Sequence, residues 1–471
     1  MKSFPVNTFL THLRPHLDEL MARFMLVRWG ETIFPGVSTS DIKYLTTGVL
    51  PDDVASEVLE EKGILPVGVG GGFLDEHSVD GTERKANECA STLVFKALKL
   101  ENDAPLSSIV EEVRHCDLTK LVKPTQLSSL IKLRHRCHPY DVSKVLEWTF
   151  FALKGLYESG AKKMEQKIYS GIMQGMFEDI VQEHGWNHGP TIAHVRMLLS
   201  QSEANSQLRL TEIANIFKLL NKKTKKKAAL WLREVLIDMY HDNRSFFKAV
   251  QEIDTLAKGK VVEFSSENDT FPVIAIDSDN ERISQAARSK YCGYIALIIQ
   301  RNMRGNTAIF LNANNQHVAK ERLCLDNLMR MIRLREQTRL GYPQGQWDNL
   351  AIEGTLRRIR MWYYSKHHDM IFNGSTTTPD VKPSRLTMAE ILDTSQHAFK
   401  WDLIRKWKTQ HARACEAQRH RGSFRNQTKP NPKRPKNDMI LDHLSVSNLQ
   451  SRAEMDAELE RIMVSYDKAI A

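Results

Sequence analysis

The chain has 471 residues, of which 41% are hydrophobic and 26% are charged, as in ordinary soluble globular proteins. A chain of this length forms about two to four domains and buries a real core, which excludes a protein that is disordered throughout. The formal net charge of +9 favours contact with phosphates or other polyanions, and a slightly basic enzyme without a polyanionic partner is an equally open interpretation.

The six cysteines argue against structural zinc and against a disulfide framework. None forms a CxxC pair, and the gaps between them are long and irregular. Free thiols in a reducing compartment are the simpler account. Residues 1–9 lack the charged-then-apolar pattern of a signal peptide, and the longest apolar run, residues 294–299, has the length of a strand. We therefore expect a cytoplasmic protein with no membrane partner, and we leave a homodimer open.

The N-terminal part of the chain alternates between short apolar segments and amphipathic ones. Residues 6–10 and 64–69 predict strands, the second of which ends in a run of glycines. We expect helices at residues 17–27, 52–61 (capped by Asp52), 88–98 and 106–115. Such a βαβ-like alternation predicts an α/β fold with a parallel sheet, whose strand ends gather polar side chains.

The middle of the chain, from residue 125 to about 256, has a mostly helical pattern that is clearest at residues 142–156 and 228–240. The lysine run at residues 222–227 is typical of a solvated helix start or loop, and less often of a phosphate-tracking patch.

A second β-rich region begins near residue 261. Its expected elements are strands at residues 272–276, 293–299 and 307–311 and a helix at residues 320–335. Residues 413–436 hold eight Lys or Arg against one acid, Glu416, together with three prolines, and this composition predicts a disordered or loosely attached basic arm.

Three potential metal ligands, His12, His16 and Asp18, follow the first predicted strand. They lie between a strand end and a helix start, where side chains of a parallel sheet converge on a cleft. Imidazole with carboxylate suits Mn, Zn or Fe, and a larger share of carboxylate suits Mn or Mg. The alternative is that the histidines are ordinary loop residues and that Asp18 and Glu19 only offset the helix dipole.

The glycine run after the second strand leads into three polar residues, Asp75, Glu76 and His77. Glycines such as Gly70 and Gly71 permit positive φ and close backbone approach, which a phosphate site can use. A tight turn with a charged tip is the alternative, because glycine runs are weak evidence on their own.

The last element is Asp117, at the end of a predicted helix that carries the sequence Glu-Glu-Val at residues 111–113. A carboxylate at a helix C-terminus opposes the helix dipole and calls for a nearby cation. A metal ion and a neighbouring Lys or Arg are equally open as that cation.

Taken in this order, the elements resemble the Myg-type branch of the DHH phosphoesterase superfamily, the melanocyte-proliferating-gene exonuclease family. The family's Thr-His…His-x-Asp-Glu opening is similar to residues 11–19, and its glycine-marked Asp-His-His signature to residues 75–77. A helix that begins like residues 88–91 follows, and then a Glu-Glu-Val…Asp element like residues 111–117. The resemblance spans residues 1 to about 160 and continues weakly to about 390, where residues 373–375 resemble the substrate loop of a DHH-associated domain.

The resemblance implies a domain order as well as an activity. It implies an N-terminal DHH-like catalytic domain at residues 1–160, a helical connecting region at 161–258 and an α+β DHH-associated-like domain at 259–400. Residues 401–471 would form a basic, partly disordered tail with a C-terminal helix. The implied cofactor is Mn²⁺ or Mg²⁺, as one or two ions, and the implied substrate is a nucleic acid or nucleotide hydrolysed by metal-activated water.

Residue roles follow from the same resemblance. The implied metal ligands are His12, His16, Asp18, Glu76 and Asp117. The implied catalytic residues are Asp18, Asp75 and His77, with His77 at the scissile phosphate. The implied substrate-binding residues are Arg14, Gly70, Gly71, Lys366, His368, Asn373, Gly374 and Ser375.

The chain departs from the family pattern at two positions. The signature reads Asp-Glu-His, and Gly68 stands where the family has a metal-bridging Asp. Glutamate can replace histidine as a ligand and favours a harder metal. Without the bridging carboxylate, three interpretations stay open: Asp75 or a hydroxide bridges two ions, the site holds one ion, or binding persists without catalysis.

The leading functional expectation is a metal-dependent nuclease or phosphodiesterase acting on RNA, DNA or short oligonucleotides. The alternatives are a small-molecule or cyclic-dinucleotide phosphoesterase on the same scaffold, and a catalytically degenerate nucleic-acid-binding protein.

Overall fold

The computed structural model describes most of the chain up to residue 423. The described residues are 3–45, 50, 54–77, 85–139, 141–158, 170–200, 209–210, 212–214, 222–267, 269–342, 345–356, 359–366, 368–374, 378 and 381–423. They divide between two compact units, Met1–Asp103 and Ala104–Lys429, each of which is described by itself. The boundaries expected at residues 160, 258 and 400 stay predictions.

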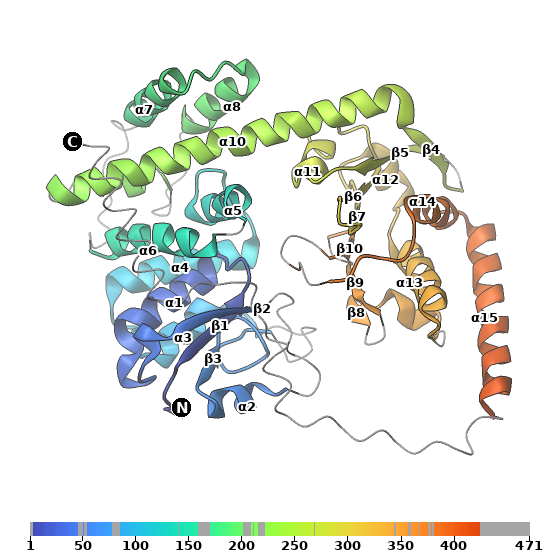
Figure 1. Ribbon diagram of the computed structural model, residues 1–471, viewed down its shortest axis with the longest axis horizontal. Helices are drawn as coiled ribbons and strands as arrows, with labels where there is room; N and C mark the ends of the chain where they lie inside the picture. Colours follow the sequence, from blue (N-terminus) through green and yellow to red (C-terminus); the bar gives the residue numbers. More distant parts are fainter. Residues whose placement is uncertain are drawn as a thin grey trace. The chain divides into compact units, whose positions relative to one another are not determined.

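The first unit is built on a three-stranded parallel sheet in the order β2-β1-β3 (Figure 1). The strands are β1 (Thr8–His12), β2 (Asp41–Leu45) and β3 (Ile64–Pro66). Its helices are α1 (Leu17–Trp29), α2 (Ser56–Glu61) and α3 (Ala90–Ala97), with the short 3₁₀ turns η1 (Gly30–Thr32) and η2 (Val37–Thr39). Both neighbours of β1 run parallel to it, which confirms the predicted parallel sheet.

β1 is the central strand of this sheet. Its first four side chains are all buried, and because successive side chains point to opposite faces, both faces of the sheet are covered at β1. Buried Arg23 on α1 then helps to position the edge strand β2. Its guanidinium donates to the carbonyls of Val37 and Ser40, just before β2, and lies 4.8 Å from the ring centre of Phe9 on β1. A single side chain thereby connects α1, β1 and the entry to β2.

The helices of the second unit confirm the predicted helical middle of the chain. They are α4 (Ala104–Thr119), α5 (Leu127–Cys137), α6 (Val142–Glu158), α7 (Ser170–Glu183), α8 (Gly189–Ser200) and α10 (Lys222–Lys260). Trp148 of α6 and Trp231 of α10 stack with ring centres 4.3 Å apart, and each indole N–H donates to the other's carbonyl. Buried Arg134 of α5 forms ion pairs with Glu234 and Asp238 of α10.

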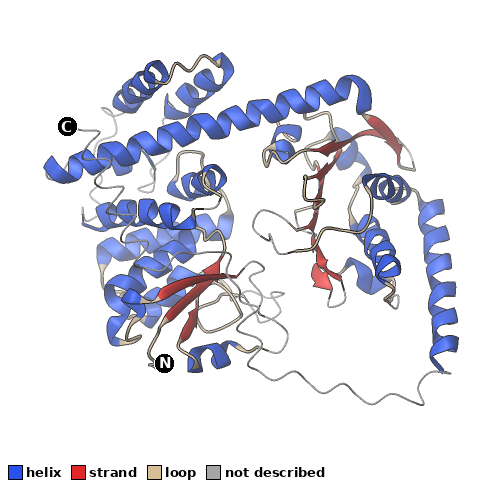
Figure 2. Cartoon of the chain, viewed as in Figure 1, coloured by secondary structure: helices blue, strands red, loops and turns tan. Residues whose placement is uncertain are grey.

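A seven-stranded mixed sheet follows, in the order β4-β5-β6-β7-β10-β9-β8. Figure 2 draws the strands in red and the helices in blue. The strands are β4 (Val262–Ser265), β5 (Thr270–Asp277), β6 (Leu297–Arg301), β7 (Thr307–Leu311), β8 (Gly354–Leu356), β9 (Ile359–Ser365) and β10 (Met370–Asn373). The accompanying helices are α11 (Ile283–Ala287), α12 (Gln316–Glu321), α13 (Asp326–Leu340), α14 (Met388–His397) and α15 (Trp401–Ser423), with the 3₁₀ turn η4 (Asp348–Ala351). The protein is therefore mixed α/β, with one small parallel sheet and one larger mixed sheet.

Each face of this sheet buries its own apolar cluster. On one face Trp362, Tyr364 and Ile371 pack with residues of α13, and Ile391 of α14 belongs to the same cluster. On the other face Ile274, Ile298 and Phe310 pack with α11 and the end of α10; we call this the α11 face.

Several predicted element boundaries are wrong. The structure breaks the helix expected at 320–335 into α12 and α13, because Arg322 adopts a left-handed conformation with φ of 48°. The strand expected at 293–299 begins only at Leu297, and β3 ends at Pro66, since Gly68 has φ of +65°. The N-cap of α2 is Ala55, while Asp52 lies outside the described residues.

The lysine run forms the first turns of α10 and is thus a helix start. Of the arm predicted at residues 413–436 to be disordered or loosely attached, residues 413–423 continue the helix α15, and residues 424–436 lie outside the described part. None of the described helices is long and apolar enough to cross a membrane.

Candidate metal centre

His12 is the last residue of β1, and α1 begins five residues later with His16 as its N-cap residue. The side chain of Glu19, in the first turn of α1, accepts a hydrogen bond from the backbone N–H of His16 at 2.7 Å. This is half of a capping box, which fixes the path between strand and helix. The same carboxylate reaches Nδ1 of His12 at 2.8 Å.

The pairing with Glu19 determines which nitrogen of His12 faces away. Burial would raise the pKa of Glu19, but the hydrogen bond with His12 and the charges of His16 and His12 hold it well below its usual range. The carboxylate is therefore ionised and can only accept, so Nδ1 of His12 carries the proton. In the neutral imidazole this leaves the lone pair on Nε2, which is the arrangement found in metal-binding histidines.

Asp18 is buried, and both of its carboxylate oxygens accept backbone hydrogen bonds from α3. The donors are the N–H groups of Ala90 and Ser91, at 2.8 and 2.9 Å. The positive end of the α3 dipole favours the ionised form of Asp18. Because each carboxylate oxygen has two lone pairs, Asp18 can serve α3 and a cation together.

The glycine-rich segment is a tight turn organised by Asp75. Gly70 and Gly71 have φ of +83° and +69°, and Asp75 accepts the backbone N–H groups of Gly71 and His77 at 2.7 and 2.9 Å. Nδ1 of His77 lies 3.1 Å from the same carboxylate, so its Nε2 faces away as in His12. The amide of Gly71, predicted to bind phosphate, is therefore already engaged.

The charged form of Glu76 is destabilised by burial and by neighbouring carboxylates. Its side chain is buried, and its carboxylate lies within 4.8 Å of that of Asp18. Burial, and then the negative charges of Asp18 and Asp75, raise the pKa of Glu76 to about 7 against the opposing influence of His77. Ligand atoms of Asp75, Glu76 and His77 all lie within 4.8 Å of one another. A cation at this position would relieve the repulsion between the carboxylates.

Glu19 also accounts for the glycine at position 68. A Cβ atom added to Gly68 would lie 2.9 Å from Cγ of Glu19, and 3.5 Å from its Oε1. The carboxylate of Glu19 thus occupies the space that a side chain at position 68 would enter.

We expect Gly68→Asp to lower the free energy of unfolding by about 1–3 kcal/mol, because the new side chain meets Glu19 and needs a left-handed backbone. Gly185→Asp is the matched control, since Gly185 has φ of +62° with nothing within 4 Å of an added Cβ. Adding Glu19→Ala to Gly68→Asp should cost less than the sum of the single changes. Chemical denaturation checks this, and strict additivity would contradict the close contact.

Two further residues predicted for this site are Arg14 and Asp117. Arg14 is half-buried in the turn after β1. Asp117 lies on α4 of the second unit, where Lys120 donates to it at 2.7 Å, so a neighbouring lysine supplies the cation that its position calls for. Its role as a metal ligand stays a prediction.

The proposed substrate loop of the second unit is largely structural. Asn373 is fully buried, and its amide binds the carbonyls of Met361 and Lys382 and the N–H of Ser384, so it is not accessible to a substrate. Gly374 has φ of +71°, and an added Cβ would lie 2.6 Å from Asn306, so it serves a tight turn. Ser375 lies outside the described residues.

Two further predicted substrate residues flank the turn between β9 and β10. Exposed Lys366 forms an ion pair with Asp326, and exposed His368 shares a hydrogen bond with Ser365 at 2.9 Å. Both are accessible, and their role in substrate binding stays a prediction.

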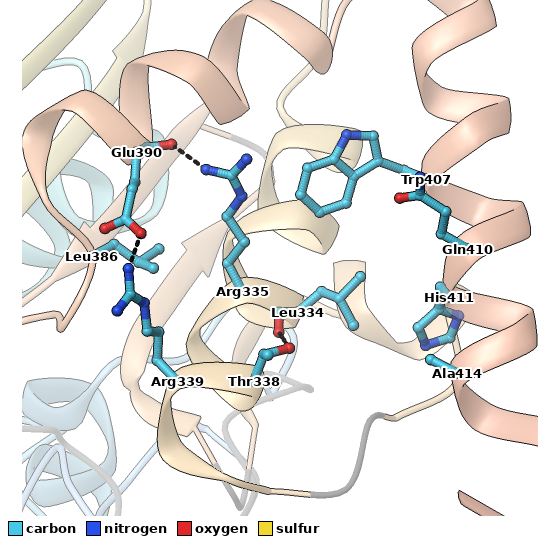
Figure 3. Close-up of a pocket in the computed structure, with 10 residues that line it drawn as sticks. All are labelled: Leu334, Arg335, Thr338, Arg339, Leu386, Glu390, Trp407, Gln410, His411 and Ala414. Atoms are coloured by element: carbon cyan, nitrogen blue, oxygen red, sulfur yellow. Dashed lines mark hydrogen bonds and ion pairs between the residues drawn. The ribbon is translucent and has the colours of Figure 1, made fainter. Parts of the chain in front are cut away.

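A pocket of about 330 Å³ in the second unit lies between α13, the start of α14 and α15 (Figure 3). Its arginines hold the helices together: Arg335 donates to the carbonyl of Glu390 and stacks 5.1 Å from the ring of Trp407, while Arg339 pairs with the Glu390 carboxylate. We interpret it as a helix-packing interface.

Comparisons with known proteins do not assign the chain to a family. No protein-family model and no curated protein matches the chain. Three chains among the solved structures match it, including an uncharacterized protein from Helicobacter pylori G27. That match has 11% identity and a TM-score of 0.20, covering 84% of this chain and 99% of the other. At that score the likeness supports no inference about fold or function.

Proposed function

We propose that the first unit binds a divalent metal ion, Mn²⁺ or Mg²⁺, and that the chain is a metal-dependent phosphodiesterase or exonuclease of the DHH type. The observation that carries the proposal is the convergence of β1, the first turn of α1 and the turn at residues 70–77 on buried carboxylates and two oriented histidines. Local sequence alone does not produce this convergence, because the turn at residues 70–77 follows the first turn of α1 by about 50 residues.

The donor set fits a hard or borderline divalent ion. His12 and His77 each turn Nδ1 toward a carboxylate and keep Nε2 for another partner. Asp18 and Glu76 add carboxylate oxygens, which suit Mn²⁺ and Mg²⁺ better than softer metals. The proposed ligands are therefore His12, Asp18 and Glu76, with His16 and Asp117 retained as predicted ligands from the sequence pattern.

The residues around the ion have separate tasks. Glu19 is a positioning residue, because it holds the ring of His12 and the backbone of His16. Asp75 positions His77 and closes the glycine turn, and His77, when protonated on both ring nitrogens, would donate from Nε2 to a phosphoryl oxygen. A bound divalent ion supplies positive charge for the phosphoryl group and a water of lowered pKa.

The substrate class follows from charge and from the proposed chemistry. A net charge of +9 favours a polyanion, and a phosphodiester of RNA, DNA or a short oligonucleotide provides both the charge and the scissile bond. Residues 259–400 would then correspond to the DHH-associated substrate-binding domain.

The test is hydrolysis by the full-length protein with Mn²⁺, Mg²⁺ or EDTA, on labelled single-stranded RNA and DNA, a dinucleotide and a cyclic dinucleotide. We expect Mn²⁺-dependent release of mononucleotides that EDTA abolishes. Turnover of the cyclic dinucleotide alone would favour the small-molecule alternative. A folded protein that is inert on every substrate and metal, yet still binds nucleic acid, would replace the proposal with a binding protein.

A further inference from the structure

The α11 face of the large sheet carries a row of apolar and aromatic side chains beyond the strands that helices cover. Phe372 of β10 lies directly between Ala308 of β7 and Tyr363 of β9 in the strand register. Because cross-strand partners point to the same face, these three side chains stand side by side. The next row along the strands holds Phe310 and Met370, and the rings of Phe310 and Phe372 meet at 5.5 Å.

This row is accessible, unlike the opposite face. Tyr363 is 45% exposed, whereas its neighbours Trp362 and Tyr364 are fully buried under α13. Phe372 is half-buried, and α10 and α11 pack on β5 and β6 of the α11 face. Burial, and then the charge of Glu353, raise the pKa of the Tyr363 hydroxyl, so its ring stays neutral at physiological pH. An exposed tyrosine beside a phenylalanine on a sheet face is a geometry suited to base stacking.

The chain segment that borders the row is strongly basic. Residues 282–310 contain five Lys or Arg and no Asp or Glu. Arg282 pairs with Asp242 and Arg301 donates to the carbonyl of Leu386, while Arg288, Lys290 and Arg304 are the other three. The guanidinium of Arg288 lies 5.6 Å from the ring centre of Phe310, at the edge of the row. A cationic side chain beside exposed aromatic rings matches the phosphates and the bases of a single-stranded nucleic acid.

We propose that this row, with Tyr363 and Phe372 as its stacking residues, binds single-stranded nucleic acid. The inference rests on the function proposed above and extends it, because it gives the nuclease a second surface that binds its substrate strand. Duplexes are disfavoured, since paired bases do not present their faces. Arg288 and its basic neighbours would contact phosphates without reading the sequence.

The test is fluorescence anisotropy of a labelled single-stranded 12-mer, as RNA and as DNA, titrated with the full-length protein in EDTA, so that binding is measured without turnover. Tyr363→Ala should weaken binding about 5- to 100-fold, the range for loss of one stacked base. Tyr363→Phe keeps the ring and should bind like the wild type. Tyr342→Ala is the matched control, because Tyr342 is 43% exposed elsewhere in the same unit.

The outcomes separate this surface from the metal centre. Wild-type affinity for Tyr363→Ala, equal losses for Tyr363→Ala and Tyr342→Ala, or equal affinity for a duplex of the same length would each overturn the proposal. Binding by the row in a protein that hydrolyses nothing would support it while removing the proposed nuclease activity. Hydrolysis that persists with no measurable strand binding at the row would do the reverse.

Discussion

Glu76→Gln should abolish metal-dependent phosphodiester hydrolysis, with a loss of more than about 100-fold in turnover. Residues that only orient metal ligands contribute 10- to 100-fold, so removal of a direct carboxylate ligand should exceed that range. The change is isosteric and removes one negative charge from the group formed with Asp18 and Asp75. Initial rates with saturating Mn²⁺ measure the effect.

Matched variants show whether such a loss is specific. Glu61→Gln changes an exposed carboxylate of the same unit and should retain wild-type turnover. Glu19→Gln should lose about 10- to 100-fold, because Glu19 acts only through His12 and His16. Asp18→Ala is less informative, since Asp18 also caps α3, and losing a cap typically costs about 1 kcal/mol of stability. Full turnover by Glu76→Gln would exclude Glu76 as a ligand.

The same Glu76→Gln change should stabilise the metal-free protein above neutral pH. The pKa of Glu76 is raised from 4.5 to about 7 by folding, so the folded state holds a proton that the unfolded state has released. The stability contributed by this group is present below about pH 4.5 and is lost as the pH rises through about 7. Glutamine carries no such charge, and the expected gain at pH 8 is up to about 3 kcal/mol.

Denaturant unfolding in EDTA at several pH values measures this difference. The gap between the variant and the wild type should be near zero at pH 4, grow from about pH 4.5 to 7, and stay constant above. Mn²⁺ should then reverse the order at pH 8, because it stabilises only the protein that binds it. A variant that is equally stable or less stable than the wild type at pH 8 would mean that the carboxylates of the cluster do not repel one another.

The elements that carry the candidate site were predictable where periodicity is strong. α1 and α3 begin within two residues of their predicted starts, because buried apolar residues dominate both helices, and β1 overlaps its predicted strand around Phe9 and Leu10. β2 was missed because three of its five side chains are partly or fully exposed, which is typical of an edge strand and gives no apolar run. Another error has its cause in the backbone. Arg322 adopts a left-handed conformation, which divides the single helix predicted at residues 320–335 into α12 and α13.

The residue types at the centre could be selected from the sequence, but their partners could not. The sequence pattern indicates Glu19 as a partner of the helix dipole. The spacing from His16 to Glu19 is also that of a capping box, and it indicates the contact with the backbone of His16 that the structure has. Its approach to Gly68 depends on the packing of α1 against the glycine turn, which no local pattern encodes. The loop of Asn373 has the composition of a binding site, and the sequence therefore predicts a substrate contact there. In the structure the Asn373 amide instead forms hydrogen bonds with three backbone groups.

Calorimetric titration of the EDTA-treated full-length protein with Mn²⁺ tests the central claim most directly. Saturable binding of one or two ions, strongly weakened in Glu76→Gln and His12→Ala and unchanged in Glu61→Gln, is the predicted result. Equal uptake by all four proteins, or none by the wild type, would show that these carboxylates and imidazoles do not hold a metal.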